Sequence, residues 1–393
     1  MRRTRRKRGR AEVAATVTGL ALGASSAITA AGMGVLAAVM ARTIVTPPRT
    51  REENVLIRAV DLEAGTVTLN LTPDSILDGE YSLWFSDDTG HARLGEVLSR
   101  DAESVTRRII DVDFGNLPRA RRGRLGGWLF LGPWSLDVPY ENVLIDTPVG
   151  PAPAWFIPAA KSTGRWVIQV HGRAVRRQEG LRVVPVFRDA GFDSLLVSYR
   201  TDGDAPDDPS GRYGLGDTEW EDVDAAIGYA LDHGAESIVL FGWSMGGAIS
   251  MQTVLRSQHA QAIMGIILES PVIDWNDVIA FHGAARRLPP GIAARAIRVM
   301  SSRWGGAVTG LRTPIDFRRL DLIARAGELT VPILLLHSDD DGYVPATGSR
   351  RLAELRPDLI TFVPYSVARH TKLWNYDPDG FARYVTEWLA RLD

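Results

Sequence analysis

Two patterns of hydrophobic and polar positions divide the chain, and the change falls near residue 142. From residue 54 to residue 112, short runs rich in β-branched residues alternate with Gly and Asp turn signals, as is typical of antiparallel strands. Beyond residue 142, apolar runs of strand length alternate with helical stretches, which is the pattern of a parallel α/β sheet. We therefore expect a small β-rich accessory domain over residues 50–140 and an α/β domain over residues 141–393.

The second pattern is interrupted over residues 271–330. This segment is helical in periodicity, rich in arginine and punctuated by proline, and it lies between two apolar runs that both read as core strands. We expect it to form a helical cap inserted into the α/β domain.

The N-terminal region has a third pattern. Seven basic residues lie within residues 1–10, and the 28 residues from Val13 to Met40 carry no charge. A crossing of a bilayer needs about 20 apolar residues, and positive charge before the span favours a cytoplasmic tip. We expect residues 11–45 to be a single transmembrane anchor, with the rest of the chain outside the cytoplasm. A cleaved secretion signal is the alternative.

The composition of the chain excludes several classes of function. The chain has no cysteine, which excludes disulfides, a thiolate nucleophile and cysteine metal sites. The net charge of −2 includes the seven basic residues of the tip, so the rest of the chain is acidic, which argues against nucleic acid as a partner. Metal-binding H-E-x-x-H, phosphate-binding P-loop and dinucleotide-binding motifs are all missing from the sequence, and we expect no metal and no cofactor.

One stretch carries a catalytic signature. Residues 242–246 read G-x-S-x-G around Ser244, after an apolar run of strand length and before a helical run. This strand–turn–helix context is that of a nucleophile elbow, in which flanking glycines relieve crowding around a strained serine. The backbone N–H of Met245 begins the helix, where unpaired donors can hold a developing oxyanion.

Three further motifs lie at the ends of expected strands. The first is His171-Gly172-Arg173, a turn whose backbone N–H groups are candidate oxyanion donors. The second is residues 336–345, where three consecutive aspartates precede Gly-Tyr-Val-Pro. The third is His370, after the last expected strand and before the last expected helix.

The four motifs, in this order, resemble the α/β-hydrolase superfamily over about 250 residues from residue 142. The resemblance implies an α/β-hydrolase fold with Ser244 as nucleophile, His370 as base and Asp341 as the acid that orients it. Asp341 matches the family's spacing, although Asp339 and Asp340 adjoin it and remain alternatives. It also implies an oxyanion hole made by the backbone N–H groups of Met245 and Arg173.

Two more residues are candidates for substrate binding. Trp243 precedes the nucleophile directly, and Glu219 lies at the start of an expected helix, where it is a candidate to bind a substrate amine. The other interpretation of Glu219 is an ion pair with Arg200.

These residues predict a membrane-anchored serine hydrolase that cleaves a small-molecule acyl substrate, an amphitropic carboxylic ester or thioester, through an acyl-enzyme. A peptidase or amidase of the same fold is the first alternative, and a non-catalytic binding module is the second. Because all four motifs lie beyond residue 170, we expect a chain without residues 1–45 to be soluble and active.

Overall fold

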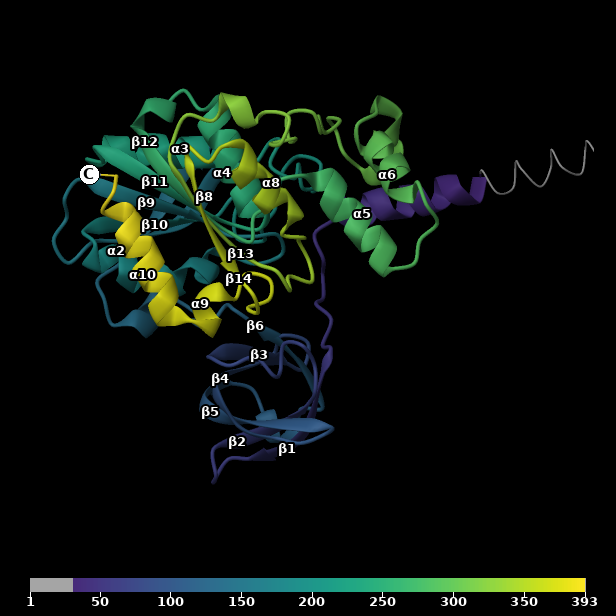
Figure 1. Cartoon of the computed structure of the whole chain (residues 1–393), viewed down its shortest axis with the longest axis vertical. Helices are drawn as coiled ribbons and strands as arrows, with labels where there is room; N and C mark the ends of the chain where they lie inside the picture. The colour runs from purple at the N-terminus through teal and green to yellow at the C-terminus, as the bar shows by residue number, and fades with distance from the viewer. Residues whose placement is uncertain (1–30, 393) are drawn as a thin grey trace, which may run out of the picture.

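The computed structural model describes residues 31–392. The chain is helical from residue 31 to residue 45, a segment called the N-terminal helix below. It then forms a closed barrel, followed by an eight-stranded sheet with helices on both faces (Figure 1). The barrel lies below the edge of the α/β domain where β13, β14 and α9 end (Figure 1).

The accessory domain is the barrel, with strands in the order β1–β2–β5–β4–β3–β6. Pairing of Val55 in β1 with Gly123 in β6 closes it. Strand alternation explains its core, because β2 buries Val67 and Leu69 and exposes the residues between them more. The strands are β1 (Val55–Asp61), β2 (Thr66–Asn70), β3 (Tyr81–Phe85), β4 (Gly90–Arg100), β5 (Ser104–Phe114) and β6 (Arg122–Gly126).

One end of the barrel is closed around a buried arginine, Arg107 of β5. Its guanidinium donates hydrogen bonds to the carbonyl oxygens of Ser75, Leu77, Gly79 and Gly95 at 2.5–3.1 Å. Arg107 thereby fixes the loop between β2 and β3, which reaches the α/β domain.

We expect Arg107→Met to destabilise the barrel by at least about 3 kcal/mol, because buried carbonyl groups would lose their donors. The measurement is the free energy of unfolding in urea. An unchanged midpoint and slope would contradict the role assigned to Arg107.

The main sheet has the order β14–β13–β12–β11–β9–β10–β8–β7. Pairing is parallel from β14 through β10, and β8 runs antiparallel to both β10 and β7. The carboxyl ends of the parallel strands therefore share one edge, where open α/β sheets carry their sites. The strands are β7 (Glu141–Thr147), β8 (Gly150–Ile157), β9 (Arg165–Val170), β10 (Phe192–Val197), β11 (Ser237–Trp243), β12 (Ile263–Glu269), β13 (Ile333–Ser338) and β14 (Ile360–Tyr365).

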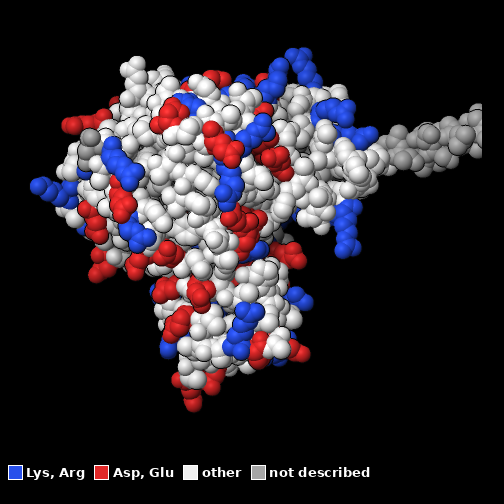
Figure 2. Space-filling view, viewed as in Figure 1, with Lys and Arg blue, Asp and Glu red and all other residues white. Residues whose placement is uncertain are grey.

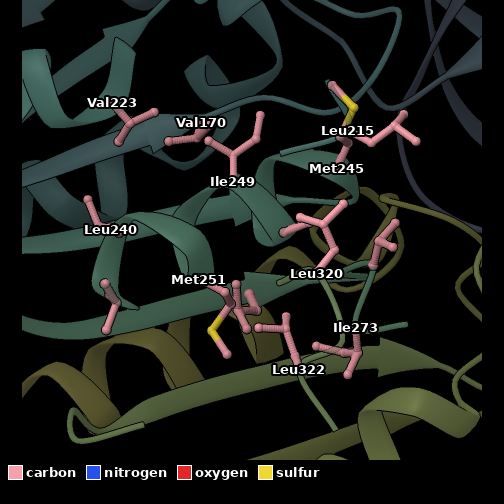
Figure 3. Close-up of a cluster of buried hydrophobic side chains, with 14 of the residues drawn as sticks. Val170, Leu215, Val223, Leu240, Met245, Ile249, Met251, Ile273, Leu320 and Leu322 are labelled. Carbon is pink, nitrogen blue, oxygen red and sulfur yellow. The ribbon is translucent and has the colours of Figure 1, made fainter. Parts of the chain in front are cut away.

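Helices cover both faces of this sheet. One face packs against α3 (Trp220–Asp232), α4 (Met245–Arg256) and α8 (Thr347–Leu355), and the other packs against α2 (Val184–Asp189), α9 (Leu373–Tyr376) and α10 (Pro378–Leu389). Figure 3 shows the first face, where apolar side chains of α4 meet those of the sheet and of the segment that carries Leu320 and Leu322. These contacts fix the N-terminus of α4, and with it the turn before the helix.

Between β12 and β13, where the sequence predicts a cap, the chain forms α5 (Trp275–Ala285), α6 (Ile292–Met300) and α7 (Gly306–Thr309). The N-terminal helix lies beside α5 (Figure 1). Its Ala37, Met40, Ala41 and Val45 are buried, and the last three belong to the main hydrophobic core.

The predicted transmembrane anchor lies mostly in residues 11–30, outside the described residues. Within residues 31–392, no helix combines the length and the apolar character needed to span a membrane. The described part of the predicted anchor, residues 31–45, is instead packed against the α/β domain.

Candidate active site

Ser244 lies in the turn between β11 and α4 with φ 51° and ψ −116°, a strained conformation for a residue with a side chain. The two glycines of the motif make this turn possible. A Cβ on Gly242 would come within 2.6 Å of the Gly246 carbonyl oxygen, and one on Gly246 would overlap the carbonyl oxygen of Val170. The local sequence therefore dictates the turn that lifts the serine hydroxyl above the sheet.

Ser244, His370 and Asp341 form one chain of contacts. His370 Nε2 lies 3.0 Å from Ser244 Oγ, and its Nδ1 lies 2.7 Å from Asp341 Oδ2. The other carboxylate oxygen of Asp341 accepts the backbone N–H groups of Tyr343 and Val344, both at 2.8 Å. Burial alone would raise the pKa of Asp341, but the neighbouring His370 and hydrogen bonds from the two histidines beside it hold that pKa far below its ordinary value. Asp341 is therefore ionised at neutral pH.

The adjoining aspartates occupy other positions. Asp339 is half exposed and pairs with Arg350. Asp340 accepts the backbone N–H groups of Ala368 and Arg369 at 3.1 and 2.9 Å, so it holds the loop before His370. Of the three aspartates, the structure places only Asp341 against the imidazole.

The predicted oxyanion loop lies against Ser244. A Cβ on Gly172 would be 3.3 Å from Ser244 Cβ, and the Gly172 N–H donates to the buried carboxylate of Glu179 at 2.8 Å. Met245 is the first residue of α4, so its N–H is among the unpaired donors of the helix N-terminus. The structure thus places Gly172, the residue before Arg173, beside the serine, and Met245 directly after the serine at the start of α4.

The side chain of Arg173 has a role that the sequence did not indicate. It leaves the loop toward the N-terminal helix and donates to the carbonyl oxygens of Thr43, Ile44 and Thr46 at 2.8–3.2 Å. Its guanidinium also stacks over the Tyr213 ring. A cation at a helix C-terminus satisfies the orphan carbonyls there, so Arg173 fastens the N-terminal helix to the oxyanion loop.

The structure does not bring Trp243 into the site. Its indole is fully buried on the opposite face of the sheet, stacked on Phe241, and donates to Glu269 Oε2 at 2.8 Å. The other oxygen of Glu269 accepts the Leu373 N–H at 3.0 Å. Through Glu269, Trp243 therefore stabilises the segment after His370. Because its indole is buried on the other face of the sheet, it is unavailable to a substrate.

Glu219 is also away from the site. It is fully buried, and it accepts the N–H groups of Gly214 and Gly216 at 2.7 and 2.9 Å, so it shapes a turn. Neither sequence interpretation describes it, because Arg200 pairs with Asp222 and Glu221 instead.

A cavity of about 600 Å³ contains Ser244 and His370 and is called the Ser244 cavity below. Its walls come from the linker at residues 48–54, the barrel, the oxyanion loop, the cap, the turn at residues 244–245 and the loops at residues 343–344 and 370–372. Residues 124–128 of the barrel and Asp74 in its β2–β3 loop face this cavity. The accessory domain is therefore part of the site.

Asp74 ties the barrel to the histidine loop. Its carboxylate lies 2.8 Å from Lys372 Nζ and 3.5 Å from the Arg369 guanidinium, on either side of His370. Burial would raise the pKa of Asp74, but these two cations, above all Lys372, lower it. No sequence motif indicates this bridge, because its partners are 298 positions apart.

The charge around the cavity is uneven. Residues 278–315 of the cap contain six arginines and no acidic residue. Figure 2 shows basic side chains projecting around the cap, whereas both signs are mixed over the rest of this face. Such a surface attracts anions. In residues 31–392, no group of three or more His, Asp or Glu side chains is arranged to hold a metal ion.

Comparison with known proteins identifies the fold family. Residues 170–384 match the model of the alpha/beta hydrolase family, which is more than half of the chain. The chain belongs to the alpha/beta hydrolase family. Residues 56–126, nearly the whole barrel, match a domain of unknown function.

Two relatives show the extent of the likeness. Human protein ABHD12B is 26% identical over 214 residues, which cover 51% of this chain and 52% of that protein, so the chain spans about half of that relative's length. An esterase from Pyrococcus furiosus, Pf2001, superposes with a TM-score of 0.52 at 18% identity over 67% of this chain and 96% of the esterase. At that identity the likeness concerns the fold alone.

Proposed function

We propose that the protein is a serine hydrolase that cleaves a carboxylic ester or thioester through an acyl-enzyme. The observation that carries this proposal is the contact chain from Ser244 Oγ through His370 to Asp341. Nucleophile, base and orienting acid lie in the order and at the distances that acyl transfer requires. An esterase among the proteins of similar fold is consistent with it.

The geometry supports a two-step reaction. Ser244 Oγ attacks the substrate carbonyl carbon while His370 Nε2 accepts the hydroxyl proton, and the carbonyl oxygen becomes the oxyanion. Backbone N–H groups of Met245 and Arg173 stabilise that oxyanion, each worth about 3 kcal/mol in comparable sites. The leaving group takes the proton from Nε2 as its bond to carbon breaks. Water then attacks the acyl-enzyme, again with His370 as base.

The structure removes one argument for the first alternative, a peptidase or amidase. A peptidase could use a carboxylate to bind the substrate amine, and Glu219 was the candidate for this role. Because Glu219 is buried in its own turn, it cannot reach a substrate. Ester or thioester cleavage is therefore the reaction that we propose.

Two measurements separate the three candidate functions. A fluorophosphonate probe should label the full-length protein at Ser244, whereas a binding module with an unused triad should not react. A panel of acyl esters and aminoacyl anilides then separates the two enzymes. Faster hydrolysis of the anilides than of every ester would reverse our assignment.

The three aspartates offer a direct test of the triad. We expect Asp341→Asn to lower kcat by a factor on the order of 10⁴, because an amide can donate to Nδ1 and so favours the wrong imidazole tautomer. The measurement is steady-state hydrolysis of the best ester.

Asp339→Asn is the matched control, because Asp339 lies two residues away and is half exposed. We expect it to keep nearly the full kcat. Equal losses in the two variants would contradict the assignment of Asp341.

A further inference from the structure

A second cavity, of about 420 Å³, adjoins the Ser244 cavity and is called the apolar pocket below. One wall is the N-terminal helix, and the other is α5 with the turn that follows it. The volume is within the range of cavities that bind small organic molecules.

The two cavities share part of their lining. Six residues line both of them: Arg173, Trp275, Val278, His282, Arg286 and Tyr343. The Tyr343 ring lies 5.4 Å from the His370 ring, between centroids, so this junction is directly beside the catalytic histidine. The apolar pocket is therefore placed beside the position where a molecule that reacts at Ser244 would lie.

The chemistry of the lining changes along this path. All of the charged and imidazole side chains of the apolar pocket belong to the shared junction. Beyond the junction, the cap supplies Ile279 and Leu288, and the N-terminal helix supplies Leu36, Val39, Met40, Thr43 and Ile44. The one hydroxyl among these, that of Thr43, is already bonded to the carbonyl oxygen of Val39 at 2.8 Å.

The part of the lining beyond the junction offers no free polar side chain, and this selects the group that can occupy it. A polar or charged group would lose its hydration there without gaining a hydrogen bond, whereas a hydrocarbon chain gains about 0.8 kcal/mol per buried methylene. Polar parts of a substrate fit the Ser244 cavity, where the barrel contributes Arg124 and Asp74 and the linker contributes Arg51 and Glu52.

We propose that the apolar pocket holds the hydrocarbon chain of an amphiphilic ester while its carbonyl group reacts at Ser244. This proposal rests on the proposed ester hydrolysis and adds the substrate class. It assigns the N-terminal helix a place in substrate selection, because that helix forms one wall of the pocket. Arg173 fixes the position of the N-terminal helix relative to the oxyanion loop through its hydrogen bonds to Ile44 and Thr46.

The test uses two exposed residues of the N-terminal helix that lie one turn apart. Val39 lines the apolar pocket, whereas Val35 faces a separate cavity with Trp304. Val39 is 58% exposed and Val35 is 63% exposed, so either accepts an indole without disturbing the core. In Val39→Trp, we expect the ratio of kcat/KM for octanoyl over acetyl esters of one alcohol to fall at least about tenfold. In Val35→Trp, the ratio should stay at its wild-type value.

A second series, acetyl esters of short and long alcohols, shows whether the pocket holds the acyl or the alcohol chain. Leu36→Trp is the further variant, because Leu36 also lines the pocket. If Val39→Trp and Leu36→Trp both keep the wild-type chain-length ratio in both series, the proposal is wrong.

Fluorescence titration with a long-chain fatty acid separates this proposal from the proposed function. If the wild-type protein binds the fatty acid and Val39→Trp does not, the pocket takes hydrocarbon chains even if no ester is cleaved. If esters are cleaved but the fatty acid binds wild type and Val39→Trp equally, hydrolysis stands and the pocket assignment fails.

Discussion

Replacing Ser244 with alanine is expected to lower ester turnover by a factor on the order of 10⁶, leaving only the residual effect of the oxyanion donors. The reason is that no other hydroxyl occupies the position 3.0 Å from His370 Nε2 in the described part of the chain. Loss of fluorophosphonate labelling and of hydrolysis should coincide. The thermal midpoint should stay close to that of the wild type, because alanine keeps the backbone and removes one oxygen.

Ser250→Ala provides the matched control for this variant. Ser250 is a fully buried serine of α4, the helix that follows Ser244, and its hydroxyl has no hydrogen-bond partner within the described residues. It should therefore be replaceable without loss of rate. A Ser244→Ala protein that keeps more than a few per cent of the wild-type rate would exclude Ser244 as the nucleophile.

Deleting residues 1–45 is expected to abolish turnover of long-chain esters and to lower the thermal midpoint by several degrees. The deletion exposes the core that Met40, Ala41 and Val45 cover, and it removes two of the three carbonyl groups that bind Arg173, those of Thr43 and Ile44. Burial of Met and Val side chains alone contributes about 2 kcal/mol each. The measurements are differential scanning fluorimetry and the hydrolysis panel.

The sequence alone led to a different expectation, namely that a chain without residues 1–45 would be active because every motif lies beyond residue 170. The contacts of the N-terminal helix are the reason for the change. Deletion of residues 1–30 is the control, since it leaves every contact described above in place, and it should preserve both rate and thermal midpoint. Wild-type stability and chain-length preference after removal of residues 1–45 would show that the N-terminal helix is dispensable.

Sequence reasoning reached those features of the site that local geometry determines. The glycines around Ser244 are required by contacts within the same turn, and Asp341 is defined by its hydrogen bonds to backbone two and three residues later. The order of strands and helices followed from hydrophobic periodicity, which reports burial directly.

Other features depend on packing between distant segments and left no local pattern. The bridge from Asp74 to Lys372 and the bonds from Arg173 to the N-terminal helix are of this kind. The burial of Trp243, by contrast, could have been predicted from the sequence. Strand alternation places it on the same face as Val239 and Phe241, away from α4, and this period predicts its burial behind the sheet.

The order of the parts along the chain also sets the order in which they leave the ribosome. The N-terminal helix, which lines the apolar pocket, and the barrel, which lines the Ser244 cavity, are synthesised before Ser244, and Ser244 is synthesised before Asp341 and His370. Because domains tend to fold as they emerge, the barrel is free to close while the hydrolase sheet still lacks β13 and β14. In the proposed mechanism, Ser244 therefore gains its base only after the N-terminal helix and the barrel have been synthesised, and a nascent chain that stops before residue 370 lacks the histidine that hydrolysis requires.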